Sequence, residues 1–355
     1  MERKTLVKKT TTKEKKETPR SSAHGIRWNL GDLYKGLDDP NLEKHYREAK
    51  KAVETFEKKY KGKIGPKPAL SGKQLAEMVK EYEQILQLRD RPHVFAHLLF
   101  AQNTQKAEFG KKLQEMQKRS TEITKHLIFV ELEWCSISEK DAAQLLKDPA
   151  IKKWHHYMEA TRRFKPHLLS EPEEKIVDEL ENSGSRAFTR LFDQMIGSMT
   201  FNVKLDGKER VMSEEEALSL LYHPDRERRK AASNGLTAGF QANLKPLTFI
   251  FNTLVDHHST YDRLRHYPDP MASRNLSNDI NPKTVDALLK TCETNSHLVS
   301  RYYKLKAKLL GLKKLYDFDR YAPISLAMPN LSWEDGKKVI IDAYKEFSPE
   351  LGAIV

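Results

Sequence analysis

The chain has 355 residues, of which 38% are hydrophobic and 32% are charged, and its formal net charge is +12. These values indicate a soluble, largely helical protein that is longer than one ordinary domain. No apolar run is long enough to span a membrane and the N-terminus lacks the apolar core of a signal peptide, so we expect a cytoplasmic protein. The two cysteines, Cys135 and Cys292, exclude a disulfide framework, and we expect both to be buried, inert thiols.

Much of the net charge comes from the first 20 residues, which hold eight Lys or Arg against three Glu and so contribute +5. The rest of the chain therefore carries only +7. We interpret residues 1–24 as a disordered basic tail. Such a tail can contact phosphates non-specifically. The body shows no zinc-finger spacing and no aromatic-basic strand motif, so specific nucleic-acid binding is not expected.

The first half of the chain reads as an array of helices. Asp39-Pro40 predicts a helix start, with Asp39 as N-cap and Pro40 in the first turn. Apolar residues then recur every three or four positions, at Leu42, Tyr46, Ala49, Val53, Phe56 and Tyr60. This stripe predicts one buried helical face that ends near Gly62. We expect a second helix over residues 75–86 and a longer one that carries residues 123–134.

One segment has the period of a β-strand. The apolar residues Met199, Phe201, Val203 and Leu205 alternate with polar ones. Asp206-Gly207 follows as a tight turn, so the pattern predicts a β-hairpin with Val211 on the return strand. Ser213 and Glu216 then form a capping box that begins the next helix.

Helical periodicity returns over residues 225–265, where we expect a kink or a split near Pro246. Within this stretch Gly235 and Gly239 are one helical turn apart and predict close helix packing. Asn281-Pro282 opens a helix that we expect to end at Gly311.

Two further helix starts occur near the end of the sequence. One is at Ser332 with Asp335, and the other is at Ser348, followed by Pro349 and Glu350. The apolar residues of the last helix are Leu351, Ile354 and Val355. We expect them to face a core outside this chain.

Several segments, in the same order along the chain, resemble one family. They are Trp28–Tyr34 with Asp39-Pro40, Thr161–Ser170 with Glu173-Glu174, Phe192–Leu221, Arg301–Leu312 and Asp319–Pro323. Together they are similar to oligoendopeptidase F, a zinc metallopeptidase of the thimet-oligopeptidase type. The resemblance implies a mainly α fold with one small sheet, in which two lobes enclose a channel for short peptides.

The resemblance also implies a division of the chain. Residues 25–190 are expected to be the N-terminal helical region of the family, and residues 191–355 the beginning of the peptidase domain. Catalysis in the family depends on H-E-x-x-H, in which two histidines bind zinc and the glutamate acts as general base. None of the 13 histidines here is followed by glutamate. We therefore assign no catalytic or metal residue, leave the substrate-binding residues open, and expect no zinc to bind this chain.

Other His-containing groups have the helical spacing that two metal ligands need. They are His93 with His97, His155-His156 with Glu159, and Asp256-His257-His258 with Asp262 and His266. Zinc sites need at least three protein ligands in the correct geometry. We interpret all three groups as packing or surface residues.

Three hypotheses follow. The leading one is the N-terminal part of a zinc endopeptidase that cleaves short peptides, truncated before the zinc motif and inactive as given, with H-E-x-x-H encoded beyond Val355. The alternative is a catalytically silent helical protein that binds peptides or a partner. A basic nucleic-acid binder is the weakest. No membrane partner is expected, and the oligomeric state is left open.

Overall fold

The computed structural model describes residues 22, 23, 25–324 and 331–355, and the chain divides into two compact units. The main unit is Leu30–Ile324, and the smaller one joins residues up to Asn29 with those from Ser325 onward. The predicted tail, residues 1–24, lies outside the described residues except for 22 and 23. In the part of the chain that is described, no helix has the length and apolarity needed to cross a membrane.

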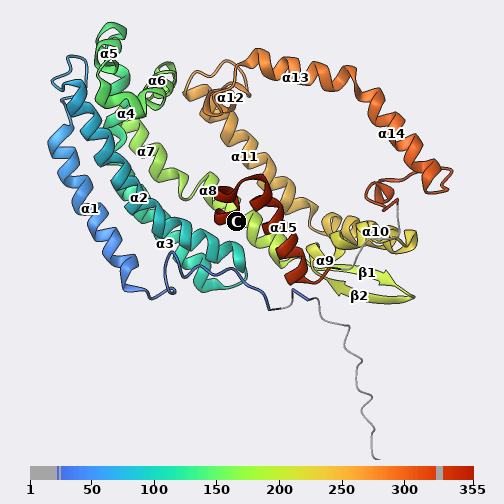
Figure 1. Cartoon of the computed structure of the whole chain (residues 1–355). Coiled ribbons are helices and arrows are strands. Elements are labelled where there is room, and N and C mark those ends of the chain that lie inside the picture. The colour runs from blue at the N-terminus through green and yellow to red at the C-terminus, as the bar shows by residue number, and fades with distance from the viewer. Residues whose placement is uncertain (1–21, 24, 325–330) are drawn as a thin grey trace, which may run out of the picture. The chain divides into compact units, whose positions relative to one another are not determined.

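The main unit begins with three helices that lie side by side (Figure 1). They are α1 (Pro40–Tyr60), α2 (Gly72–Gln102) and α3 (Ala107–Thr124). Asp39 caps α1 by accepting the Asn41 backbone N–H at 2.9 Å. The predicted stripe on α1 is buried except for Tyr46, which is half-buried. The predicted first helix is therefore confirmed.

A second group of helices closes the core that α1 and α2 begin. Its members are α4 (Ile128–Ser136), α5 (Glu139–Leu146), η1 (Pro149–Trp154), α6 (His155–Arg162) and η2 (Lys165–His167). The prediction of one helix through residues 123–134 is wrong, because α3 ends at Thr124 and a turn precedes α4. The break lets Ile123 and Trp134 both enter the same core from helices of different direction. Trp134 also donates its indole N–H to the Met158 carbonyl at 2.8 Å.

The chain then forms a small sheet between helices. The elements are α7 (Glu171–Glu181), α8 (Ser185–Ser198), β1 (Phe201–Leu205), β2 (Lys208–Met212), α9 (Glu214–Ser219), η3 (Leu220–Tyr222) and α10 (Arg226–Ala242). The strands are antiparallel, with Phe201 opposite Met212 and Leu205 opposite Lys208. Positive φ at Asp206 and Gly207 makes the predicted turn.

Helix α10 packs directly on β1, and its two glycines make this possible. A Cβ at Gly235 would lie 2.7 Å from the Asn202 carbonyl oxygen, and a Cβ at Gly239 would overlap the Phe201 ring. The predicted hairpin, its capping box at Ser213 and the close packing at both glycines are all confirmed.

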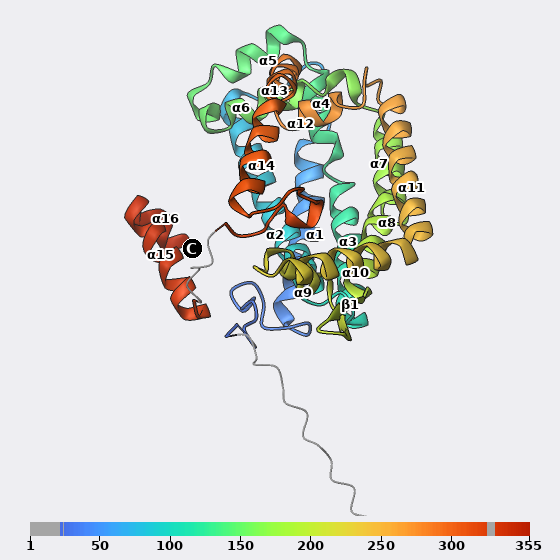
Figure 2. The same ribbon diagram turned by 90° about the vertical axis from the view of Figure 1, so that its right-hand side faces the viewer.

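The rest of the main unit comprises α11 (Leu244–Leu264), α12 (Ala272–Ser277), α13 (Pro282–Thr294), α14 (Ser296–Leu309) and η4 (Asp317–Asp319). Helix α8 packs along α11 (Figure 2). The predicted split near Pro246 is confirmed by the break at Asn243. The single helix expected from residue 282 to Gly311 is wrong. Helix α13 ends at Thr294, where Asn295 is the C-cap and donates from its backbone N–H and its side-chain amide to the Thr291 carbonyl.

Figure 1 shows α13 and α14 as an extended arm that leads from α12 toward the segment beside α10. Although all of residues 282–309 are described, none of their hydrophobic side chains is buried. The predicted boundary between residues 190 and 191 falls inside α8 and within the main unit. That division remains a prediction.

The smaller unit contains α15 (Trp333–Phe347) and α16 (Pro349–Ile354). Both predicted caps are present, because the Ser332 hydroxyl accepts from Asp335 N–H and the Ser348 hydroxyl accepts from Leu351 N–H. Ile354 is 82% exposed, so the predicted outward position of this apolar residue is observed.

Candidate functional site

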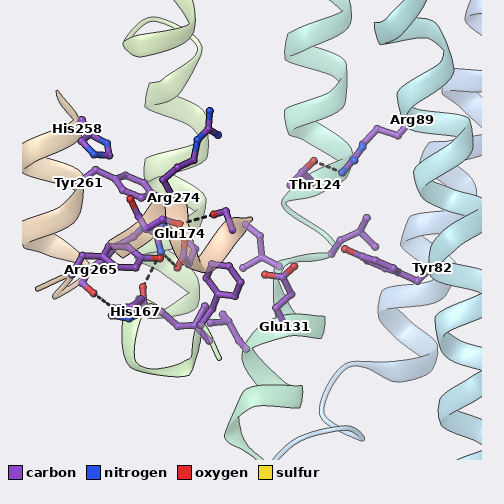
Figure 3. A pocket seen from close by; sticks show the side chains of 18 residues that line it. Tyr82, Arg89, Thr124, Glu131, His167, Glu174, His258, Tyr261, Arg265 and Arg274 are labelled. Atoms are coloured by element: carbon purple, nitrogen blue, oxygen red, sulfur yellow. Dashed lines mark hydrogen bonds and ion pairs between the residues drawn. The ribbon is translucent and has the colours of Figure 1, made fainter. Parts of the chain in front are cut away.

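A cavity of about 730 Å³ lies in the main unit between helices that are distant in sequence (Figure 3). Helices α2, α3 and α4 provide one wall, while α7, α11, α12 and the η2 segment provide the other. The polar and aromatic lining residues used below are Tyr82, Arg89, Glu131, Phe164, His167, Glu174, Tyr261, Arg265, Tyr267 and Arg274. This volume is in the range of small-ligand sites.

A buried ion pair organises one wall of the cavity. Arg265 donates from Nη1 to Glu174 Oε1 and from Nη2 to Glu174 Oε2, each at 2.7 Å. Glu174 Oε1 also accepts the Leu169 backbone N–H at 3.0 Å. A two-bond arginine–carboxylate pair has fixed geometry, and its removal leaves an uncompensated charge. The pair therefore holds the end of α11 against the first turns of α7.

His167 strengthens the same junction. Its ring Nδ1 lies 2.8 Å from the Arg265 carbonyl oxygen, and its own carbonyl accepts from Arg265 Nη1 at 3.2 Å. The ring stacks on Tyr267 with centroids 3.9 Å apart. These contacts fix the position of the imidazole in the cavity wall. Arg265 and Tyr267, which the ring contacts, both follow the last residue of α11.

Glu131 stands on α4, opposite this wall. It keeps accessible surface toward the cavity, but the surrounding protein raises the pKa of its carboxyl group. Glu174 raises this pKa further, and Arg265 acts in the opposite direction. No hydrogen bond or ion pair from the described residues reaches the carboxyl group. Among the described residues, the Glu131 carboxyl group thus faces the cavity without a hydrogen-bond or ion-pair partner.

The two cysteines differ in environment. Cys135 is buried close to the cavity, and burial raises the pKa of its thiol to about 11. It is therefore an unreactive thiol, as predicted. Cys292 is exposed on α13, so the expectation that it is buried is wrong. Its helix packs against too little of the described chain to cover it.

The three His-containing groups with helical spacing, interpreted from the sequence as packing or surface residues, lie as follows. His258 Nε2 lies 3.2 Å from Asp262 Oδ2, but His266 has a φ of 58° beyond the end of α11 and so leaves their helical face. Burial lowers the pKa of His93, and His97 lowers it further.

The pair His155 and His156 separates, because His155 faces Glu159 at 3.3 Å while His156 faces Asp279 at 3.0 Å. No group of three or more His, Cys, Asp or Glu among the described residues could hold a metal ion. These residues do not fit zinc, and no zinc-dependent step is assigned to them.

A second buried charge network connects α10 to the segment that follows the arm. Asp319 is fully buried and accepts from Arg229 Nη2 at 2.9 Å and from Arg226 Nη2 at 2.8 Å. Burial acts to raise the pKa of Asp319, but the bonds from both arginines outweigh it and keep the pKa below its ordinary value. Lys306 of α14 donates to the Arg320 carbonyl at 2.7 Å. The base of the arm is therefore firmly attached.

Sequence reasoning missed the residues that form both networks. His167 and Glu174 lie in segments that carry the family resemblance, but no role was predicted for them. Glu131 is the clearest signal in hindsight, since it interrupts the apolar run Ile128-Phe129-Val130. An acid within an otherwise apolar helical segment is a candidate for a specific role.

Comparison with known proteins agrees with the fold and the segment matches. Residues 133–201 match the family model described as Oligopeptidase F. The Group B oligopeptidase PepB of Streptococcus agalactiae is 26% identical over 277 residues, which are 76% of this chain and 45% of PepB. Oligopeptidase PepF of Bacillus subtilis is 23% identical over 333 residues, which are 92% of this chain and 48% of PepF.

The solved structure of oligoendopeptidase-F from Enterococcus faecium has the same fold over 89% of this chain and 63% of its own, with a TM-score of 0.73 and 18% identity. The chain spans about half the length of the curated relatives that it matches. The ordered segments, the helical fold with its hairpin and these matches agree with one another: over most of its length the chain is similar to the oligoendopeptidase F family.

Proposed function

We propose that this chain supplies a helical, non-catalytic part of a zinc endopeptidase that acts on short peptides. The zinc-binding H-E-x-x-H helix would come from residues outside these 355. The observation that carries the proposal is the uncovered apolar surface of the arm, α13 and α14, in a chain whose 13 histidines include no His-Glu pair.

The arm exposes seven large hydrophobic side chains. They are Leu288, Leu289, Leu298, Val299, Tyr302, Leu305 and Leu309, each between 47% and 62% exposed. Scattered surface hydrophobics are ordinary, but a continuous set on two consecutive helices is typical of an interaction surface. The curated relatives are about twice as long as the matched region. A further segment of this family is therefore the partner that we expect to cover the arm.

The alternative is a silent peptide-binding protein, and the cavity beside Glu131 favours it. Binding does not require a catalytic centre. The two proposals differ in one respect, namely whether zinc-dependent hydrolysis appears when a catalytic segment is added. We also propose a cytoplasmic location, because both cysteines are free thiols, as in a reducing compartment.

The test combines the purified chain with a separately produced family segment that carries H-E-x-x-H. Hydrolysis of a quenched fluorescent peptide is measured with and without zinc. We expect no turnover by the chain alone and zinc-dependent turnover by the mixture above that of the added segment. Zinc-dependent turnover by the 355-residue chain alone would contradict the proposal.

Variants locate the contact surface. Leu305→Arg places a charge on the exposed face of α14, and we expect it to abolish the gain from mixing. Val211→Arg is the matched control, because Val211 is also exposed but lies on β2, away from the arm. Equal loss in both variants, or in neither, would show that the arm is not the docking surface.

A further inference from the structure

We propose that the cavity beside Glu131 binds a primary ammonium group, such as the N-terminus of a short peptide. This inference deepens the proposed function by naming the part of the peptide that is recognised. It concerns binding only and involves no catalytic step. The argument uses the position of one acid, the aromatic lining, the distribution of positive charge and the cavity volume.

The acid is Glu131, whose carboxyl group has no polar partner among the described residues. Figure 3 shows it between Tyr82 on one side and the group around Arg265 on the other. Because Glu131 is exposed toward the cavity and no described residue occupies its carboxylate, the group is available to a ligand that enters the cavity. A cationic ligand would supply the missing counter-charge and would favour the ionised form of Glu131.

The aromatic lining suits an organic cation. Tyr82, Phe164, Tyr261 and Tyr267 all line the cavity. Aromatic faces attract alkylammonium ions, and they also accept the carbon atoms that such ions carry. A bare metal cation would instead need several oxygen ligands, and the described residues offer no such cluster.

Three arginines line the cavity, but two of them have polar partners that reduce their repulsion of a cationic ligand. Arg265 is neutralised by Glu174. Arg89 donates to Asp90 at 2.7 Å and to Thr124 at 3.1 Å. Arg274 is exposed, and no hydrogen bond from the described residues engages its guanidinium group. It can therefore donate to carbonyl or carboxylate oxygens of the same ligand, which favours a peptide over a simple amine.

The volume supports the same class of ligand. About 730 Å³ accommodates a segment of a few amino-acid residues but no folded domain. The ligand class is thus a short chain with a free amino group at one end and hydrogen-bond acceptors beyond it.

The experiment is isothermal titration calorimetry of the full chain with three probes. They are the tripeptide amide Ala-Phe-Ala-NH2, its N-acetylated form, and phenethylamine. We expect the free tripeptide to bind about tenfold or more tightly than the acetylated one, since the charge-assisted contact is lost. If phenethylamine binds as well as the tripeptide, the ammonium site is supported and Arg274 makes no contribution.

Glu131→Gln tests the acid directly. This variant should bind the free and the acetylated tripeptide equally, while Glu209→Gln, on the exposed strand β2, should keep the preference. Glu131→Asp retains the negative charge and should keep a weaker preference for the free over the acetylated tripeptide. If Glu131→Gln loses that preference and Glu131→Asp keeps part of it, the loss comes from the missing charge and not from a damaged fold. Equal affinity of the original chain for both tripeptides, or an unchanged preference in Glu131→Gln, would overturn the proposal. Neither result depends on hydrolysis, so failure here leaves the mixing experiment for the proposed function intact.

Discussion

Residues 40–162 and residues 282–309 are both mainly helical, but they differ in the burial of their hydrophobic side chains. The first region buries many of them, most in a large core that includes Phe56, Phe129 and Trp134 and others in smaller clusters. The second leaves them in contact with solvent along α13 and α14. Helix-forming sequence is therefore no guide to local stability in this chain. The stability of the first region comes from packing, whereas the second is held mainly at its base by Asp319 and Lys306.

The largest effect is expected from Trp134→Ala in the packed region. Trp134 is 1% exposed and donates to the Met158 carbonyl. Truncation leaves a large cavity and an unsatisfied carbonyl, so we expect unfolding to become easier by about 3–5 kcal/mol. Urea denaturation followed by far-ultraviolet circular dichroism measures the change. A loss below about 1 kcal/mol would mean that this core is not well packed.

Arg229→Met should have the next largest effect, because it acts on the base of the arm. Arg229 is 3% exposed, and the variant would leave Asp319 with only part of its counter-charge. Breaking one partner of a buried pair typically costs about 3 kcal/mol or more. The control is Arg47→Met, which removes an exposed pair with Glu43 and should cost less than about 1 kcal/mol. Similar denaturation curves for the two variants would contradict the assigned role of Asp319.

The acids Asp319 and Glu131 should give opposite pH dependences of stability. The folded-state pKa of Asp319 is lowered, so its contribution is present above the unfolded pKa and is lost as the pH falls through the folded pKa. The folded-state pKa of Glu131 is raised, so its contribution is present below the unfolded pKa and is lost as the pH rises through the folded pKa. Glu131→Gln should therefore stabilise the chain at pH 7 and have little effect near pH 4. Thermal unfolding at both pH values tests the sign, and destabilisation at pH 7 would contradict it.

The smallest effect is expected from Leu288→Ala on the arm. Leu288 is 62% exposed, so its truncation should change the free energy of unfolding by less than about 0.5 kcal/mol. Urea denaturation beside Trp134→Ala makes the comparison within one experiment. A loss of 2 kcal/mol or more would show that the arm is packed against another surface in the isolated chain, for example in an oligomer.

Much of the local structure was predictable because its causes are local. The N-caps at Asp39, Ser332 and Ser348 bond to backbone groups two or three residues away, and the turn at Asp206-Gly207 needs only its own backbone angles. The buried stripe of α1 was also readable, since helical geometry alone places those residues on one face. The family resemblance came from the same source, namely short segments in a constant order.

The tertiary structure decided the features that join distant residues. Nothing near Glu174 in the sequence points to Arg265, which lies 91 positions away, yet this pair joins α7 to the end of α11 in the wall of the cavity. The breaks at Thr124 and Asn295 were missed because apolar periodicity continues through both. A periodic pattern shows which side chains prefer burial, but it contains no information on which surface will cover them. Ile123 and Leu298 look alike in sequence, and only the presence of a packing partner makes one a core residue and leaves the other exposed.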